Sequence, residues 1–171
     1  SGHLLPGCPV GAQAVLEVLR DAGFEESDEV HDLERDLVDY IPPRPSTQRS
    51  NLRLLRTEDL AALDAFLATE FPGRWRHDVL AKLQVEADLG FLAGAFDEGR
   101  CVGFALLQDW RTTRTPIGGA VWRASLGPRW GALGPIGVAR ALRGRGLGDT
   151  LLAYGLDSLR KRGVHRCVID W

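Results

Sequence analysis

Methionine is absent from the 171 residues, and cysteine occurs only at Cys8, Cys101 and Cys167. The missing methionine predicts that the sequence is a processed or excised part of a longer chain. The cysteines lie far apart and lack metal-ligand spacing, which argues against a disulfide framework and a zinc site. No apolar run approaches the ~20 residues of a membrane helix, and no segment has the layout of a secretory signal. We therefore expect a cytoplasmic protein with no bound metal and no membrane partner.

Charge is unevenly distributed, although the formal net charge is only −2. Residues 1–50 carry four basic and ten acidic side chains, whereas residues 128–166 carry eight basic and two acidic ones. A short basic segment in a near-neutral chain argues against a nucleic-acid partner, which needs a broad basic face. It fits one small anionic ligand, because the forked guanidinium of arginine suits phosphate. GC-rich coding would produce the same excess of arginine over lysine, so composition leaves both explanations open.

A proline-rich segment divides the chain. Three prolines within residues 42–45 interrupt both helix and central strand, so residues 41–50 are predicted to be an extended linker. Before the linker, apolar side chains at helical spacing predict a helix over residues 11–20, and residues 24–37 are expected to be extended. The chain length suits one globular domain, or one domain and a fragment.

Residues 51–171 show the periodicities of a mixed α+β domain. The predicted order is a strand, two helices, three strands, a helix and a final strand. Residues 91–96 and 101–107 are predicted to form a hairpin around a turn at residues 97–99, and residues 111–130 a long loop or irregular strand. This order indicates a mostly antiparallel mixed sheet flanked by helices, with one β-α-β crossover near the end.

Between the strand predicted at residues 133–138 and the helix predicted at residues 147–161, glycine recurs at alternate positions. The glycines are Gly144, Gly146 and Gly148. At a helix start, free N–H groups and the helix dipole make an anion site, and the flanking Arg143 and Arg145 suit a pyrophosphate. The lysine of a P-loop is missing, and the glycines do not have Gly-x-Gly-x-x-Gly spacing. A single turn glycine would need no ligand, but three glycines at alternate positions beside two arginines favour one.

These residues resemble the GNAT superfamily of N-acetyltransferases, whose signature Gln/Arg-x-x-Gly-x-Gly/Ala lies between the fourth strand and the third helix. Residues 143–148, Arg-Gly-Arg-Gly-Leu-Gly, match that signature. The predicted order of elements is similar to the family over residues 51–171. The resemblance implies a transferase that moves an acetyl group from acetyl-CoA directly to a primary amine on a small molecule or a peptide.

The resemblance also implies where the coenzyme lies. Backbone groups of Ile136 and Val138 would pair with the pantetheine arm as an extra strand would, and the amides of residues 143–149 would hold the pyrophosphate. Gly134, Pro135 and Gly137 would fit a bulge that turns an N–H toward the thioester carbonyl. The implied coenzyme-binding residues are Ile136, Gly137, Val138, Arg143, Gly144, Arg145, Gly146, Leu147, Gly148 and Asp149.

The catalytic groups depart from the family pattern. An acid often stands on the fourth strand, but residues 130–138 contain none. The usual general acid is a tyrosine on a fourth helix, and the sequence stops before such a helix. Asp109 and Glu70 remain as weak candidates for proton transfer on the acceptor side, and each also fits a solvated charge. The acceptor pocket is expected from residues 57–87 and 109–130, whose shape the pattern does not predict.

The N-terminal segment resembles the parts that are missing at the other end. Residues 11–37 are similar to the fourth helix and following strand of a GNAT domain, with Leu19 at the position of the tyrosine. Either residues 1–40 are the tail of a preceding domain in a tandem protein, or they fill the place beside the strand at residues 164–169. We expect that strand to be covered by residues 1–40 of the same chain or of a homodimer partner, because an unpaired strand invites aggregation.

Two other functions stay open. A degenerate GNAT domain that binds acyl-CoA without catalysis would explain the missing strand acid and the leucine at position 19. A structural or dimerisation domain would keep the fold and lose the ligand.

Overall fold

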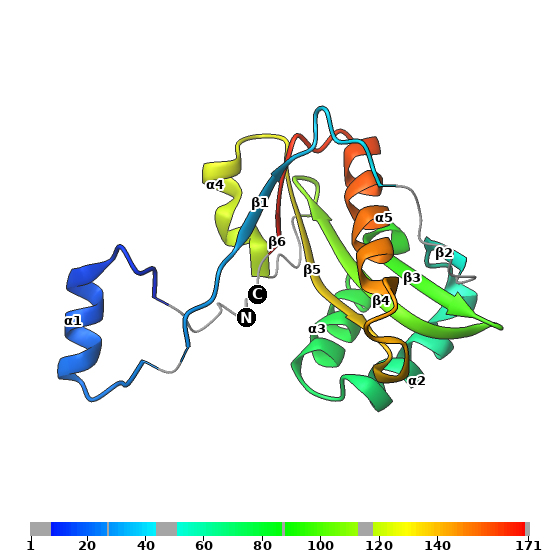
Figure 1. The fold of residues 1–171 in the computed structure, drawn as a ribbon, viewed down its shortest axis with the longest axis horizontal. Coiled ribbons are helices and arrows are strands. Elements are labelled where there is room, and N and C mark those ends of the chain that lie inside the picture. Colours follow the sequence, from blue (N-terminus) through cyan, green and yellow to red (C-terminus); the bar gives the residue numbers. More distant parts are fainter. Residues whose placement is uncertain (1–7, 27, 44–50, 87, 113–117, 170–171) are drawn as a thin grey trace.

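The computed structural model describes residues 8–26, 28–43, 51–86, 88–112 and 118–169. One six-stranded sheet has the order β1-β6-β5-β4-β3-β2, and all neighbouring strands are antiparallel except β5 and β6 (Figure 1). The strands are β1 (Leu33–Asp36), β2 (Asn51–Leu54), β3 (Leu92–Asp97), β4 (Arg100–Asp109), β5 (Trp130–Val138) and β6 (Arg166–Ile169). The helices are α1 (Gln13–Asp21), α2 (Leu60–Glu70), α3 (Arg74–Leu83), α4 (Arg123–Leu126) and α5 (Leu147–Lys161). The predicted fold class, with its single parallel crossover through α5, is confirmed.

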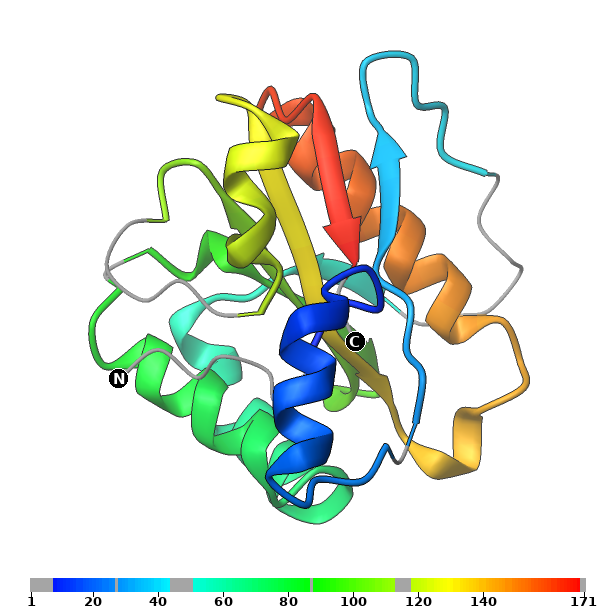
Figure 2. The ribbon, with the colours of Figure 1, turned by 90° about the vertical axis from the view of Figure 1, so that its left-hand side faces the viewer.

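Helices cover both faces of the sheet because the side chains of each strand alternate between the faces. Leu106 of β4 packs in a cluster with α2 and α3, while the next residue, Leu107, packs in a cluster with α5. The two helical layers lie on opposite sides of the sheet (Figure 2). The chain therefore crosses from the sheet to one face in the loop between β5 and α5. Among the described helices, none is long and apolar enough to cross a membrane.

The segment predicted as a long loop or irregular strand contains helix instead. Residues 118–122 form a 3₁₀ turn that continues into α4, while residues 113–117 lie outside the described residues. Ala120 and Leu126 are buried against Trp130 at the start of β5. Burial of these apolar side chains orders a stretch whose glycines and threonines suggest irregular structure.

The strand at residues 164–169, predicted to need a partner, has one in the same chain. β1 pairs antiparallel with β6, and the carboxylate of Glu34 on β1 forms an ion pair with Arg166 on β6. Leu37, just after β1, is fully buried in the cluster on the α5 side. The expected cover by residues 1–40 is therefore confirmed for the strand.

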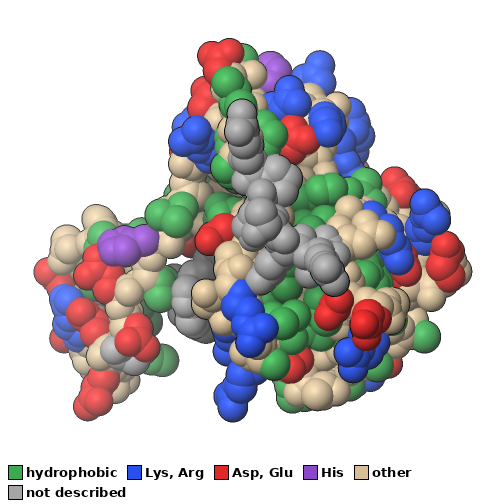
Figure 3. Space-filling view, turned by 45° about the vertical axis from the view of Figure 1, so that its right-hand side comes forward, with side chains coloured by type: hydrophobic (Ala, Val, Ile, Leu, Met, Phe, Trp, Pro, Cys, Tyr) green, Lys and Arg blue, Asp and Glu red, His purple; other side chains and the backbone are tan. Residues whose placement is uncertain are grey.

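The N-terminal helix α1 does not pack against the sheet beside β1 and β6. None of the residues of α1 is buried, and Val15 and Val18 are 52% and 67% exposed. The helix belongs to a lobe that stands apart from the body and gathers acidic side chains (Figure 3). The expectation that the helix as well as the strand fills the place beside β6 is therefore wrong for the helix. Leu19 lies on α1, within this separate lobe.

Leu37→Ala is expected to lower the free energy of unfolding by about 2–5 kcal/mol, because it leaves a cavity where β1 is anchored. Chemical denaturation of the purified variant measures the change. Val38→Ala is the matched control: Val38 is 58% exposed, so its truncation should change stability by less than about 0.5 kcal/mol. A small effect of both substitutions would contradict the docking of β1 onto β6 in solution.

Candidate functional site

Glycine shapes the loop that follows β5. The chain makes a 3₁₀ turn over Arg140–Leu142 and enters α5 at Gly146. Gly144 and Gly146 have φ angles of 73° and 75°, in the left-handed region that side-chain-bearing residues adopt at a cost. Gly146 is also the N-cap of α5 and offers no side chain to cap the helix. The first turn of α5 is therefore left open.

The backbone N–H groups of residues 144–149 form a potential anion site. None of them donates to a backbone or side-chain acceptor within the described part of the chain, and the first such bond runs from the Thr150 N–H to the Gly146 carbonyl (3.1 Å). The 15-residue helix adds the positive end of its dipole. A hollow of about 390 Å³ opens at this point, lined by Val138, Arg143, Gly144, Gly146, Gly148 and Asp149.

The other residues of the predicted coenzyme set lie beside this hollow. Ile136 and Gly137 belong to β5, and Arg145 is exposed in the loop. Leu147 is 1% exposed, so its side chain belongs to the core and only its backbone N–H is available. Arg143 is held toward β5, because its Nε donates to the Val138 carbonyl at 3.3 Å. The structure thus brings the whole predicted set to one end of the sheet.

β5 offers a free edge beyond its pairing with β6. Among the described residues, the two strands pair at the first three residues of β5, whereas β5 continues to Val138. The Ala139 N–H donates to the Val102 carbonyl on β4 (2.8 Å). Because successive residues of a strand point in opposite directions, the N–H groups of Val138 and Ile136 point away from β4. An extended ligand along this edge would meet backbone donors at alternate residues.

A bulge interrupts β5 where it diverges from β6. Ala105 of β4 lies opposite Ile136, and Leu107 lies opposite Leu133, so β5 has one residue more than β4 between these pairs. The extra residue falls within residues 134–135, whereas Gly137, also expected in the bulge, pairs in regular register with Phe104. Bulges redirect backbone groups, and this one lies at the start of the free edge.

Asp109, the first catalytic candidate, is the last residue of β4. It lies opposite Gly131 of β5, two residues before Leu133. Its side chain is 5% exposed, and the Arg111 N–H donates to Asp109 Oδ1 at 2.9 Å. Nη1 atoms of Arg111 and Arg162 both lie 3.7 Å from Asp109 Oδ2. The alternative of a solvated charge is therefore wrong for this residue, which is a buried, ion-paired carboxylate.

Glu70, the second candidate, lies at the other end of β5. Its Oε2 accepts a hydrogen bond from the Arg140 N–H at 3.0 Å, just after β5 ends. Asp109 is level with Gly131, at the start of β5. The structure does not bring the two candidates together.

One buried lysine, Lys82, was not predicted from the sequence. Lys82 on α3 is 1% exposed, with its Nζ 3.6 Å from Glu86 and 5.2 Å from the centre of the Phe91 ring. Burial lowers the pKa of Lys82, because a low-dielectric site disfavours the ammonium, while Glu86 and Asp109 act in the opposite direction. Lys82 and Asp109 thus share one polar region. A lysine–glutamate pair four residues apart usually marks an exposed helix face, so the pattern gave no signal of burial.

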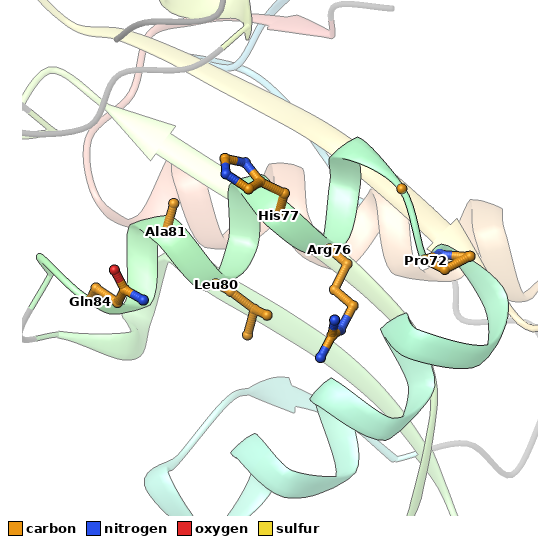
Figure 4. A pocket seen from close by; sticks show the side chains of 7 residues that line it. Pro72, Arg76, His77, Leu80, Ala81 and Gln84 are labelled. Carbon is orange, nitrogen blue, oxygen red and sulfur yellow. The ribbon is translucent and has the colours of Figure 1, made fainter.

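A second hollow, of about 320 Å³, runs along one side of α3 (Figure 4). Its residues recur at intervals of three and four, which places them on one stripe of the helix. Arg76 in this stripe pairs with Asp64 of α2 at 2.9 Å. The hollow is lined by Pro72, Gly73, Arg76, His77, Leu80, Ala81 and Gln84. It shares no lining residue with the hollow at the start of α5.

Solved structures share this fold. The GCN5-related glucosamine N-acetyltransferase region of a fungal multi-domain GH3 β-N-acetylglucosaminidase matches with a TM-score of 0.81 and 23% identity, over 98% of this chain and 21% of that one. A GCN5-related N-acetyltransferase from Sphaerobacter thermophilus matches with a TM-score of 0.72 and 20% identity, over 95% of this chain and 48% of that one. This chain therefore spans less than half the length of either protein.

A GNAT family acetyltransferase from Brucella melitensis, solved in complex with acetyl-CoA, matches with a TM-score of 0.53 and 25% identity, over 71% of this chain and 75% of that one. Comparison with the curated proteins gives no match. The family model described as Acetyltransferase (GNAT) family matches residues 60–170. The chain therefore belongs to the GNAT acetyltransferase family.

Proposed function

We propose that this chain binds acetyl-CoA at the start of α5 and transfers the acetyl group directly to a primary amine. The observation that carries the proposal is the row of backbone N–H groups at residues 144–149, which have no acceptor among the described residues and border an open hollow. Six donors at a helix start beside Arg143 suit a pyrophosphate. The chemistry of this donor set therefore fits the coenzyme that the family uses.

Each part of the site has a distinct task in this proposal. The amides of residues 144–149 and the guanidinium of Arg143 bind the two phosphates, and the free edge of β5 aligns the pantetheine arm. The bulge at residues 134–135 directs a backbone N–H to the thioester carbonyl, where negative charge grows during attack. The amine nitrogen bonds to the carbonyl carbon and the C–S bond breaks. One proton leaves the amine and one joins the departing thiolate.

Asp109 is the proposed relay for the amine proton, because it lies on β4 opposite Gly131, three residues before the bulge of β5 begins. Glu70 contacts the loop after β5 and is too far along the strand to share this task. The amine acceptor, a homodimer, a cytoplasmic location, and the division into residues 1–40, 41–50 and 51–171 of a tandem protein stay predictions from the sequence.

A non-catalytic acyl-CoA-binding domain is the second candidate, and one observation favours it. β5 carries no carboxylate, and both candidate carboxylates are engaged, Asp109 by two arginines and Glu70 by the Arg140 N–H. Calorimetry with acetyl-CoA and a thiol-release assay with a panel of amines separate the possibilities. Binding with thiol release supports the transferase, binding without release supports the second candidate, and no binding overturns both.

Arg143→Ala is expected to weaken CoA binding by about 10- to 100-fold, because it removes a charge-assisted bond to phosphate. Arg145→Ala should weaken binding less than about threefold, since Arg143 lines the hollow and Arg145 does not. Titration calorimetry with CoA measures both affinities. Equal affinities of the wild type and Arg143→Ala would mean that the ligand lies elsewhere.

Substitutions at Gly148 test CoA binding and the stability of the fold separately. A Cβ at this position would meet nothing within 4 Å, and the residue lies in the first turn of α5. Gly148→Ala should therefore raise the free energy of unfolding by up to about 1 kcal/mol. Gly148→Leu should fold but weaken CoA binding more than tenfold, because its side chain fills the hollow.

Thermal unfolding without ligand and calorimetry with CoA measure the two quantities. Gly155→Ala on the same helix is the control, since its Cβ would lie 2.6 Å from Leu133 Cδ1 and should destabilise the fold. Full CoA affinity in Gly148→Leu would contradict the proposed position of the pyrophosphate.

A further inference from the structure

We propose that the corner between α2 and α3 positions the coenzyme loop through two consecutive residues, Glu70 and Phe71. The inference rests on the proposed function, because it concerns the geometry of the same coenzyme site. It assigns to Glu70 a positioning role in place of proton transfer. Three separate contacts from this corner reach the end of β5 and the loop after it.

The first contact caps the turn that leads into the loop. Ala139 is the N-cap of the 3₁₀ turn over Arg140–Leu142, and alanine has no side-chain acceptor for the first N–H groups. Glu70 supplies the missing acceptor from another element, since its Oε2 receives the Arg140 N–H at 3.0 Å. Glu70 is also the last residue of α2, where the dipole of that helix disfavours a negative charge. The carboxylate of Glu70 is therefore stabilised by its hydrogen bond to the loop after β5, and not by the dipole of α2.

The second contact sets the position of β5. The ring of Phe71 lies so close to Gly137 that a Cβ there would be 2.5 Å from Phe71 Cζ. The ring is itself held in an aromatic cluster, with ring centres 4.9 Å from Trp75, 5.7 Å from Phe66 and 5.9 Å from Phe104. Phe71 therefore presses a rigid group of rings against the backbone of the strand edge that would align the pantetheine arm.

The third contact supports the arginine of the hollow. The guanidinium carbon of Arg143 lies 5.9 Å from the centre of the Phe71 ring, within the range of a cation–π contact. The Nε of the same side chain donates to the Val138 carbonyl. The Phe71 ring and the Val138 carbonyl together restrict the side chain of Arg143, which borders the hollow. Residues 70–71 therefore contact the strand β5, the 3₁₀ turn after it and the side chain of Arg143.

The test compares Glu70→Ala with Glu70→Gln. Glu70→Gln keeps an oxygen that accepts the Arg140 N–H, whereas Glu70→Ala removes it. Both remove a negative charge near a polyanionic ligand, which by electrostatics alone would tighten binding. We expect Glu70→Ala to weaken CoA binding by about 3- to 10-fold, the effect of a lost cap. Glu70→Gln should bind at least as tightly as the wild type.

Glu58→Ala is the matched control, because Glu58 is 67% exposed and pairs with Arg56 at 3.6 Å, away from the coenzyme loop. It should leave CoA affinity unchanged. Amide hydrogen exchange without ligand provides a second readout: the Arg140 N–H should exchange faster in Glu70→Ala and at the wild-type rate in Glu70→Gln. Phe71→Leu, which keeps an apolar side chain but removes the ring, should also weaken CoA binding about threefold or more.

The outcomes are distinguishable. If the wild type does not bind CoA, the proposed function fails and this inference fails with it. If the wild type binds CoA but Glu70→Ala binds equally well, the proposed function stands and the positioning role is overturned. Weaker binding in both Glu70→Ala and Glu70→Gln would also overturn it, because an acceptor oxygen kept at residue 70 would then not preserve the affinity.

Discussion

The site depends on one constraint: where α5 begins, the backbone N–H groups of residues 144–149 have no acceptor among the residues that the structure describes. A side chain at the N-cap would satisfy part of this set, but Gly146 has none. Left-handed backbone at Gly144 and Gly146 lets the loop turn without side chains covering the amides. An uncompensated row of donors is costly unless water or a ligand satisfies it. Because most residues of this loop are exposed or half-buried and the hollow is open, water or an anionic ligand can satisfy these donors.

The sheet provides the second half of the site by letting two parallel strands diverge. β5 and β6 pair over three residues, and a bulge lies where the free edge of β5 begins. The opposite edge of β6 is closed by β1, which is anchored by the fully buried Leu37. The N-terminal segment thus covers the outer edge of β6, while β5 beyond Ala132 keeps an edge that is unpaired among the described residues.

The sequence predicted those features that arise from local backbone chemistry. The glycine loop before α5 and the turn at residues 97–99 between β3 and β4 both follow from local requirements for left-handed backbone. In the structure, Glu98 and Gly99 have positive φ. The pairing of β1 with β6 followed from the cost of an exposed strand edge. Contacts between distant elements could not be predicted. The hydrogen bond from Arg140 to Glu70 spans 70 residues, and the burial of Lys82 and Asp109 depends on how α3, β4 and α5 pack together.

The most direct test of the central claim is the change in backbone amide shifts in ¹⁵N-labelled protein on titration with CoA, compared with pantetheine, which lacks the phosphates. The account predicts that CoA shifts the amides of residues 144–149 strongly and that pantetheine leaves them nearly unchanged while affecting residues 136–138. Unchanged amides at residues 144–149 in saturating CoA, or equal shifts with both ligands, would contradict it.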